Sequence, residues 1–304
     1  MIHQFLRFLF VFFTLNFIWP YSPPLSSLFG TAVVNHTSIT LTQHFNNCIS
    51  NPPDSNFGRV FYKNPIQFLD SSFNSTVSFY TRFSFTINPP PPPCLSGEGL
   101  TFLITSDPSS LQDSVGCIGL PKSRDQNSLD SRFLAVEFDT NFDEALGDIN
   151  DNHVGINLDS IFSVASVDLE SGGINLKSGK QITAWIEYRN TQKVIMIWVG
   201  YTQKRKPENQ ILVAPIDLSK RFNGPVYVGF SAANGRGSAI HLLNNWYFKT
   251  SESVSPTVKD EIVGSENCLI CFPEDPVGKQ RARYLVLFLL IETLIELYRI
   301  TRIR

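Results

Sequence analysis

Apolar and polar residues alternate in several short segments between about residues 37 and 250. Phe83, Phe85 and Ile87 are separated by polar residues, and segments 195–199 and 226–230 repeat this spacing of apolar residues. A period of two places every second side chain on the same face, which is typical of strands with one buried face. Amphipathic helical spacing is scarce over the same range. The pattern therefore predicts an all-β domain.

Turn-forming sequences separate these segments. Glycine, asparagine, serine and proline favour the backbone angles that tight turns require. Five consecutive prolines at 89–93 predict a stiff connection between two strands. Many short strands at fairly regular spacing indicate an antiparallel sandwich or barrel. The turn sequences are Ser171-Gly172-Gly173, Ser178-Gly179, Arg189-Asn190, Asn223-Gly224-Pro225 and Asn234-Gly235.

The N-terminal region has the features of an export signal. Arg7 precedes the apolar run 8–18, and small residues follow at Ser26, Ser27 and Gly30. We predict a signal peptide over residues 1–29, with cleavage between about 26 and 32. A membrane anchor is the competing interpretation, but the run is short for a span and prolines follow it.

The C-terminal region changes composition twice. Residues 251–283 are rich in Ser, Glu, Asp and Pro and are predicted to be a polar linker, which leaves residues 30–250 as the folded domain. Residues 284–304 begin with an apolar run, but Glu292 and Glu296 follow it. An acid near the centre of a span costs roughly 2.5 to 3.5 kcal/mol on insertion scales. A partial membrane anchor and an amphipathic terminus therefore both remain open.

Glycosylation motifs and overall charge narrow the class of protein further. Asn35-His36-Thr37 and Asn74-Ser75-Thr76 have the acceptor pattern for N-glycosylation, which agrees with export. The formal net charge is −2 and the lysines and arginines are scattered. No basic face of the kind that binds nucleic acid is therefore expected.

The five cysteines suit an oxidising compartment. We predict a disulfide between Cys48 and Cys94 and a buried thiol at Cys117, which lies among apolar residues. Cys268 and Cys271 have no second cysteine pair or nearby histidine to complete a zinc site. They are predicted to form a local or inter-chain disulfide.

Candidate chemistry is concentrated in one acidic stretch. In a strand, Glu137 and Asp139 point to the same face, so two carboxylates leave the sheet together. The next loop adds Asp143 and Asp148, and His153 opens the following apolar strand. Oxygen ligands suit Ca²⁺, whereas carboxylates with an imidazole suit Mn²⁺ or another transition ion. The stretch therefore predicts a pair of different cations.

Two other interpretations of this stretch are weaker. The spacing of Asp139, Asn141 and Asp143 is that of an EF-hand loop, but Glu144 and Asn150 stand where such a loop needs Gly and Glu. A merely solvated loop would not explain why two acids interrupt an apolar strand. The metal interpretation is retained.

The acidic stretch and its neighbours closely resemble the signature of the legume, or L-type, lectins. The resemblance implies a legume-lectin-like antiparallel jelly-roll sandwich of the concanavalin type. It is strongest to the ectodomains of plant L-type lectin-domain receptor kinases, particularly the class VIII branch, although no kinase motif follows here. The matching segments are Val136-Glu137-Phe138-Asp139-Thr140, 147–156, Ser160-Ile161-Phe162-Ser163, Gly58-Arg59-Val60-Phe61-Tyr62, Ala184-Trp185-Ile186-Glu187-Tyr188 and 227–232.

This resemblance implies a role for each acidic residue. The transition-metal ligands of the family match Glu137, Asp139, Asp148 and His153, and Ser163 matches the residue that holds a metal-bound water. Asp139 and Asp148 would also bridge to Ca²⁺. Calcium would further take the main-chain oxygen of Asn141 and the side chain of Asp143.

The carbohydrate contacts implied by the resemblance depart from the family at three positions. Glu98 stands where Asp is usual, Asp143 where Asn is usual, and Asn141 where an aromatic residue is usual. Backbone donors near Gly116 and Gly235 complete the candidate site. An ionised carboxylate has no N–H to donate to a sugar hydroxyl.

The resemblance therefore implies a secreted or cell-surface, non-enzymatic protein that binds glycans or glycoproteins with Ca²⁺ and Mn²⁺. A lectin fold that has lost simple-sugar binding and recognises a protein or an apolar ligand is the alternative. Glycoside hydrolysis needs two uncommitted carboxylates, and the acids here are assigned to metal. A homodimer and membrane association both remain open.

Overall fold

The computed structural model of the chain describes residues 25–35, 38–44, 56–70, 75–109, 117–120, 132–219, 221–222, 224–251 and 270–271. All of these residues belong to one compact unit over Met1–Cys271. The second unit, Phe272–Arg304, lies outside the described residues.

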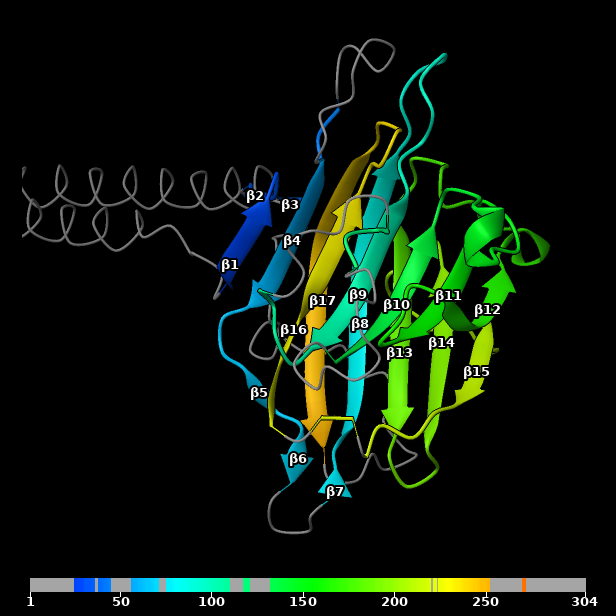
Figure 1. Cartoon of the computed structure of the whole chain (residues 1–304). Helices are drawn as coiled ribbons and strands as arrows, with labels where there is room; N and C mark the ends of the chain where they lie inside the picture. Colours follow the sequence, from blue (N-terminus) through cyan, green and yellow to red (C-terminus); the bar gives the residue numbers. More distant parts are fainter. Residues whose placement is uncertain are drawn as a thin grey trace, which may run out of the picture. The chain divides into compact units, whose positions relative to one another are not determined.

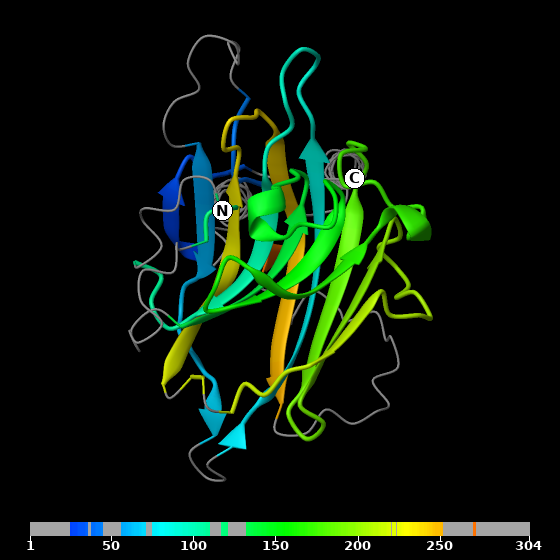
Figure 2. The same ribbon diagram turned by 45° about the vertical axis from the view of Figure 1, so that its right-hand side comes forward.

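The described unit is an antiparallel sandwich of two large sheets, visible as two layers in Figures 1 and 2. The first sheet has the order β1 (Leu25–Gly30), β4 (Phe57–Tyr62), β16 (Pro225–Ala233), β9 (Gly99–Thr105), β10 (Phe133–Asp139), β11 (His153–Leu158) and β12 (Ser163–Asp168), and β5 (Ile66–Gln67) pairs with β16. The second has the order β15 (Leu212–Pro215), β14 (Val194–Gly200), β13 (Ile182–Arg189), β8 (Ser78–Asn88), β17 (Ile240–Ser251), β3 (Ile39–Thr40) and β2 (Val33–Val34), and β18 (Ile270–Cys271) pairs with β17.

Smaller elements complete the unit. A short hairpin joins β6 (Leu69–Asp70) to β7 (Ser75–Thr76). The helical turns in the described part of the chain are two short 3₁₀ segments, η2 (Glu144–Leu146) and η3 (Glu170–Gly172). The all-β sandwich predicted from the alternating pattern is confirmed.

Aromatic side chains fill the space between the two sheets. Phe83 of β8 lies with its ring centroid 4.8 Å from that of Phe230 on β16 and 5.7 Å from that of Phe138 on β10. Phe85 contacts Phe138 at 4.8 Å. These rings come from opposite sheets and are almost completely buried. Edge-to-face and offset ring pairs of this kind add stability beyond area burial, so they fix the position of β10 and the acids at its end.

The strand predictions agree with the observed burial. Ile195, Ile197, Val226 and Val228 all face the core. The connection 89–98 between β8 and β9 contains the predicted run of prolines. Alternation locates the buried face because successive side chains leave a strand on opposite sides.

The structure bears on the predicted cysteines and termini only in part. Cys94 takes part in a disulfide, as predicted, and Cys117 is a buried thiol. Cys48, Cys268 and residues 1–24 lie outside the described residues. The last residues of the predicted signal peptide form β1, which pairs with β4. Within the predicted linker, β18 pairs with β17. None of the described helices is long and apolar enough to cross a membrane.

Candidate metal and ligand site

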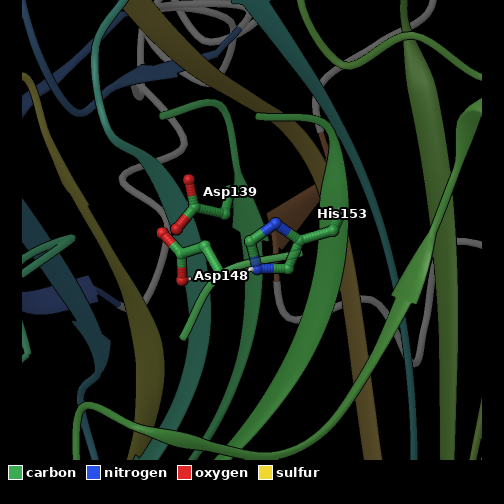
Figure 3. Close-up of side chains that lie close together, drawn as sticks. All are labelled: Asp139, Asp148 and His153. Atoms are coloured by element: carbon green, nitrogen blue, oxygen red, sulfur yellow. Dashed lines mark ion pairs between the residues drawn. The ribbon is translucent and has the colours of Figure 1, made fainter. Parts of the chain in front are cut away.

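The acids and the histidine of the candidate site converge where β10 ends and β11 begins. The antiparallel register places Asp139 opposite His153 and Glu137 opposite Gly155. The intervening loop brings in Asp148. One ligand atom from each of Asp139, Asp148 and His153 lies within 4.8 Å of the others, and Figure 3 shows the three side chains facing one another. The three-residue core of the predicted metal site is thus assembled.

The imidazole of His153 is oriented by the backbone of the loop. Its Nδ1 donates to the carbonyl oxygen of Asn150 at 2.7 Å, since a carbonyl can only accept. The other nitrogen, Nε2, lies 3.7 Å from Glu137 Oε1 and 4.0 Å from Asp148 Oδ1. A ring held through Nδ1 presents Nε2 to a cation, which is the usual arrangement of a metal-binding histidine.

Backbone N–H groups hold the loop carboxylates in place. Asp139 Oδ1 accepts from the N–H of Asn141 at 2.7 Å, and Asp148 Oδ2 accepts from the N–H of Asp143 at 2.7 Å. Asp143 Oδ1 in turn accepts from the N–H of Ala145 at 2.9 Å and caps η2. The loop therefore presents its acids through its own backbone, and each bonded carboxylate keeps a second oxygen for a ligand.

Burial makes the negative charge of this cluster costly without a cation. It raises the pKa of Asp139 well above its usual range, and it raises the pKa of Asp148 as well. For His153, burial lowers the pKa, but the nearby carboxylates of Glu137 and Asp139 outweigh it and raise the pKa to about 9. The cluster without metal therefore retains protons, and a divalent cation that replaced them would find oxygen and nitrogen donors suited to a transition ion.

Ser163 and Gly155 complete the environment of Glu137. The hydroxyl of Ser163, at the start of β12, donates to Glu137 Oε1. A Cβ built on Gly155 would collide with this carboxylate oxygen and with the Ser163 hydroxyl. Glycine is thus required at this position because the carboxylate passes directly over the β11 backbone.

Replacement of Gly155 by alanine is expected to destabilise the fold and weaken transition-metal binding. The added methyl group would displace Glu137, and overpacking of this kind costs about 1 to 3 kcal/mol. Chemical unfolding in chelator, followed by metal titration, measures both effects. Gly172→Ala is the matched control, because a Cβ there meets open space. Equal behaviour of the two variants would contradict the role given to Gly155.

A cavity of about 700 Å³ opens beside the cluster and joins it to the predicted carbohydrate residues. Glu137, Asp139 and Asp148 line one part of it. Apolar side chains, further polar residues and the turn after β16 line the remainder. The other lining residues are Leu95, Ser96, Glu98, Cys117, Ile118, Leu120, Asn141, Asp143, Leu146, Ile161, Asn234, Gly235, Arg236 and Gly237.

The predicted carbohydrate residues with described positions all reach this cavity. Glu98, Asn141, Asp143 and Gly235 line it, whereas Gly116 lies outside the described residues. His153 and Ser163 are not among the lining residues: His153 lies beside Glu137 and Asp148, and Ser163 contacts Glu137. The structure therefore brings the candidate metal and carbohydrate residues to one place.

The carboxylate of Glu98 links two turns at the cavity. Its Oε2 accepts from the N–H of Ile118 at 2.8 Å, and its Oε1 lies where a Cβ on Gly235 would stand. Gly235 has a positive φ of 51°, which favours glycine. The longer side chain of Glu98 thus reaches the 117–120 turn and packs against the 234–237 turn.

Several contributors to the site were not assigned from the sequence. The Asn150 carbonyl, the Ile118 N–H and the space at Gly155 act through backbone, which any residue type provides. Of these, only the role of Gly155 could have been inferred from the sequence, because a glycine within a strand indicates that another group closely approaches its backbone.

Fold and site together define a lectin-type β-sandwich, with an acid–histidine cluster beside a ligand-sized cavity. The family model of the legume lectin domain matches residues 12–263. The chain belongs to this family, whose members are non-catalytic carbohydrate-binding proteins.

Within this family, the chain is similar in sequence to two Arabidopsis thaliana receptor kinases. It is 46% identical to L-type lectin-domain containing receptor kinase S.6 over 265 residues, which cover 84% of this chain and 37% of the kinase. Receptor kinase VIII.2 is 35% identical over 74% of this chain and 30% of the kinase. The chain therefore spans about a third of each kinase and is related to their lectin ectodomains. The higher identity to S.6 means that the predicted class VIII branch is not singled out.

Solved lectins from Ulex europaeus have the same fold. Lectin II is 28% identical, with a TM-score of 0.62, and the match covers 77% of this chain and 95% of the lectin. Lectin I in complex with the methyl glycoside of α-L-fucose is 25% identical, with a TM-score of 0.62 and coverage of 77% and 95%.

Proposed function

We propose that this protein binds extracellular glycans through a pocket that depends on Ca²⁺ and Mn²⁺. The main support is that the acids of the acid–histidine cluster line one cavity together with the described candidate carbohydrate residues. Related lectins have been crystallised with bound sugar. The cations would shape the pocket and would not react.

The donor types suggest how two cations would divide the cluster. Mn²⁺ would take Glu137, Asp139, Asp148 and His153, because an imidazole favours a transition ion. Ser163 would hold a metal-bound water. Ca²⁺ would share Asp139 and Asp148 and would add the Asn141 main-chain oxygen and the Asp143 carboxylate, an all-oxygen set.

The sugar would lie against the calcium side of this cluster. Asp143 and Glu98 offer carboxylate acceptors, and the turns at Gly116 and Gly235 offer backbone N–H groups. Asn141 lines the cavity, and the side chain of its neighbour Phe142 is 53% exposed. Glycans or glycoproteins are the expected partners.

A location outside the cytosol accords with the related receptor-kinase ectodomains. We propose a signal peptide at the N-terminus, the lectin domain over about residues 30–250, a linker over 251–283 and a hydrophobic segment over 284–304. Leu25–Gly30 pairs with β4. Cleavage before Leu25 would therefore retain this strand in the mature protein, whereas cleavage after Gly30 would remove it.

Glycan-array binding is expected to be lost in EDTA and restored by added Ca²⁺ and Mn²⁺. Without cations the buried acids repel one another and the loop that carries Asn141 and Asp143 loosens. Array signals with chelator, with each cation alone and with both provide the measurement. Glycan binding that is indifferent to chelation would contradict the proposal.

A second candidate function is recognition of a protein or an apolar ligand after loss of simple-sugar binding. The observation that favours it is the Glu98 carboxylate, which is already engaged by the Ile118 N–H, in a cavity with many apolar lining residues.

The double variant Glu98→Asp with Asp143→Asn distinguishes the two candidates. If the pocket has lost sugar recognition, the variant should gain binding to neutral monosaccharides on the array while the parent chain shows none. Binding by the parent chain favours the first proposal. Metal-dependent folding without any glycan signal in either protein supports protein or apolar-ligand recognition.

A further inference from the structure

An arginine lines the cavity together with the acids. Arg236 is exposed and lies in the turn after β16, next to Gly235 and Gly237, which line the cavity too. It forms no ion pair with any residue in the described part of the chain. Its guanidinium group is therefore available to a ligand.

The turn holds Arg236 on a fixed backbone. The N–H of Gly237 donates to the Asn234 carbonyl at 2.7 Å, and the N–H of Ser238 donates to the Leu95 carbonyl at 2.9 Å. The Asn234 side chain accepts from the N–H of Ala239 at 2.9 Å. These contacts define the backbone of the turn, so the position from which the arginine side chain extends is set before a ligand arrives.

The charges in the cavity favour an anion only when the cations are present. With both cations bound, Glu137, Asp139, Asp143 and Asp148 would be ionised, and the charges of the two divalent cations would balance theirs. The remaining charges are those of Glu98 and Arg236. Glu98 already accepts an N–H at the 117–120 turn, whereas Arg236 has no such partner among the described residues. The cation-loaded cavity thus keeps one uncommitted positive group.

The surroundings of Arg236 match a sugar acid better than a simple inorganic anion. Leu95 is 69% exposed and lines the same cavity, which gives an apolar surface near the charged group. A uronic acid has an apolar ring face and a carboxylate on C5, and arginine binds carboxylates through two parallel hydrogen bonds. Resting on the proposed glycan-binding function, we propose that Arg236 selects glycans that carry a uronate residue.

Matched pairs of methyl glycosides that differ only at C6 provide the test. Methyl uronides and methyl hexosides of the gluco, galacto and manno series are titrated into the full chain in Ca²⁺ and Mn²⁺. At least one uronide should bind about ten times more tightly than its matched hexoside, as expected for a charge-assisted bidentate contact. This affinity ratio should decrease as salt is added.

Substitutions identify the group responsible. Arg236→Gln should reduce the uronide-to-hexoside affinity ratio to about one, and Arg236→Lys should keep part of the preference. Arg205→Gln is the control, because Arg205 is 80% exposed and does not line the cavity. Cation-dependent hexoside binding with no uronide preference, or a preference that survives Arg236→Gln, would overturn this inference and leave the proposed function intact. Absence of binding to any glycoside, and to any glycan on the array, would overturn both.

Discussion

Asp139→Asn is expected to abolish binding of both cations, so that the variant is less stable than the parent chain with cations and more stable in chelator. Asp139 is one of the two acids that both proposed sites share, and it is buried among other acids. With cations, the parent chain gains about 4 kcal/mol at a thousandfold excess over the dissociation constant, and the variant loses this gain. In chelator the variant should be the more stable protein, because burial disfavours the ionised carboxylate of Asp139, whereas the amide is neutral at every pH.

Thermal unfolding of both proteins, with cations and with EDTA, measures these four stabilities. The Asn side chain can still accept the Asn141 N–H, so loop geometry is preserved in the variant. Asp151→Asn is a suitable control, because Asp151 lies in the same loop but its side chain is 58% exposed and pairs with Lys177. Cation-dependent stabilisation of the Asp139→Asn protein would show that this acid is not a shared ligand.

The free energy of unfolding of the metal-free protein is expected to fall as pH rises from 6.5 to about 9. Over this range His153 is protonated in the folded protein, with a pKa of about 9, whereas the unfolded histidine has lost its proton above 6.5. Because the folded state then binds more protons, stability decreases with pH, by an amount on the order of 1 to 3 kcal/mol. The raised pKa values of Asp139 and Asp148 act in the same direction.

Another buried histidine acts outside this window. Burial lowers the pKa of His241 to about 3, so its contribution is lost only as pH falls below 6.5. Denaturant unfolding at several pH values in EDTA measures the expected decline in the free energy of unfolding between pH 6.5 and 9. His153→Gln should make this decline smaller. With Ca²⁺ and Mn²⁺ the trend should reverse, because cations bind only the deprotonated ligands. Metal-free stability that rose between pH 6.5 and 9 would contradict the proton-retaining cluster.

The sequence was sufficient to predict the strand faces and the converging acids. Alternation around Phe83 and Val226 identified buried faces, and the i, i+2 spacing of Glu137 and Asp139 placed both on one side of β10. It did not specify which strands pair: β16 lies beside β9 although about 130 positions separate Val228 from Leu100. Alternation reports a face, whereas pairing depends on how the whole chain closes.

Two features that depend on partners distant in the sequence were not predicted: a backbone contact in the site and the strand β1. The contact of Glu98 with the Ile118 N–H depends on the path of a loop, and every residue except proline offers the same donor. The strand β1 overlaps the predicted signal peptide because apolar residues suit both an export signal and a paired strand. Local sequence cannot separate these cases, since the partner strand β4 lies about 30 residues away.

The two walls of the cavity differ in how far their residues are separated along the chain. The candidate metal ligands all fall within residues 137–163, on adjacent antiparallel strands and the loop that joins them. The opposite wall comes from Glu98, Ile118 and the turn at Gly235, which meet only when β9 and β16 are paired. Closing a short loop costs less entropy than closing a long one. The hairpin that carries the candidate metal ligands can therefore form early in folding, whereas the cavity exists only once the full sandwich has closed.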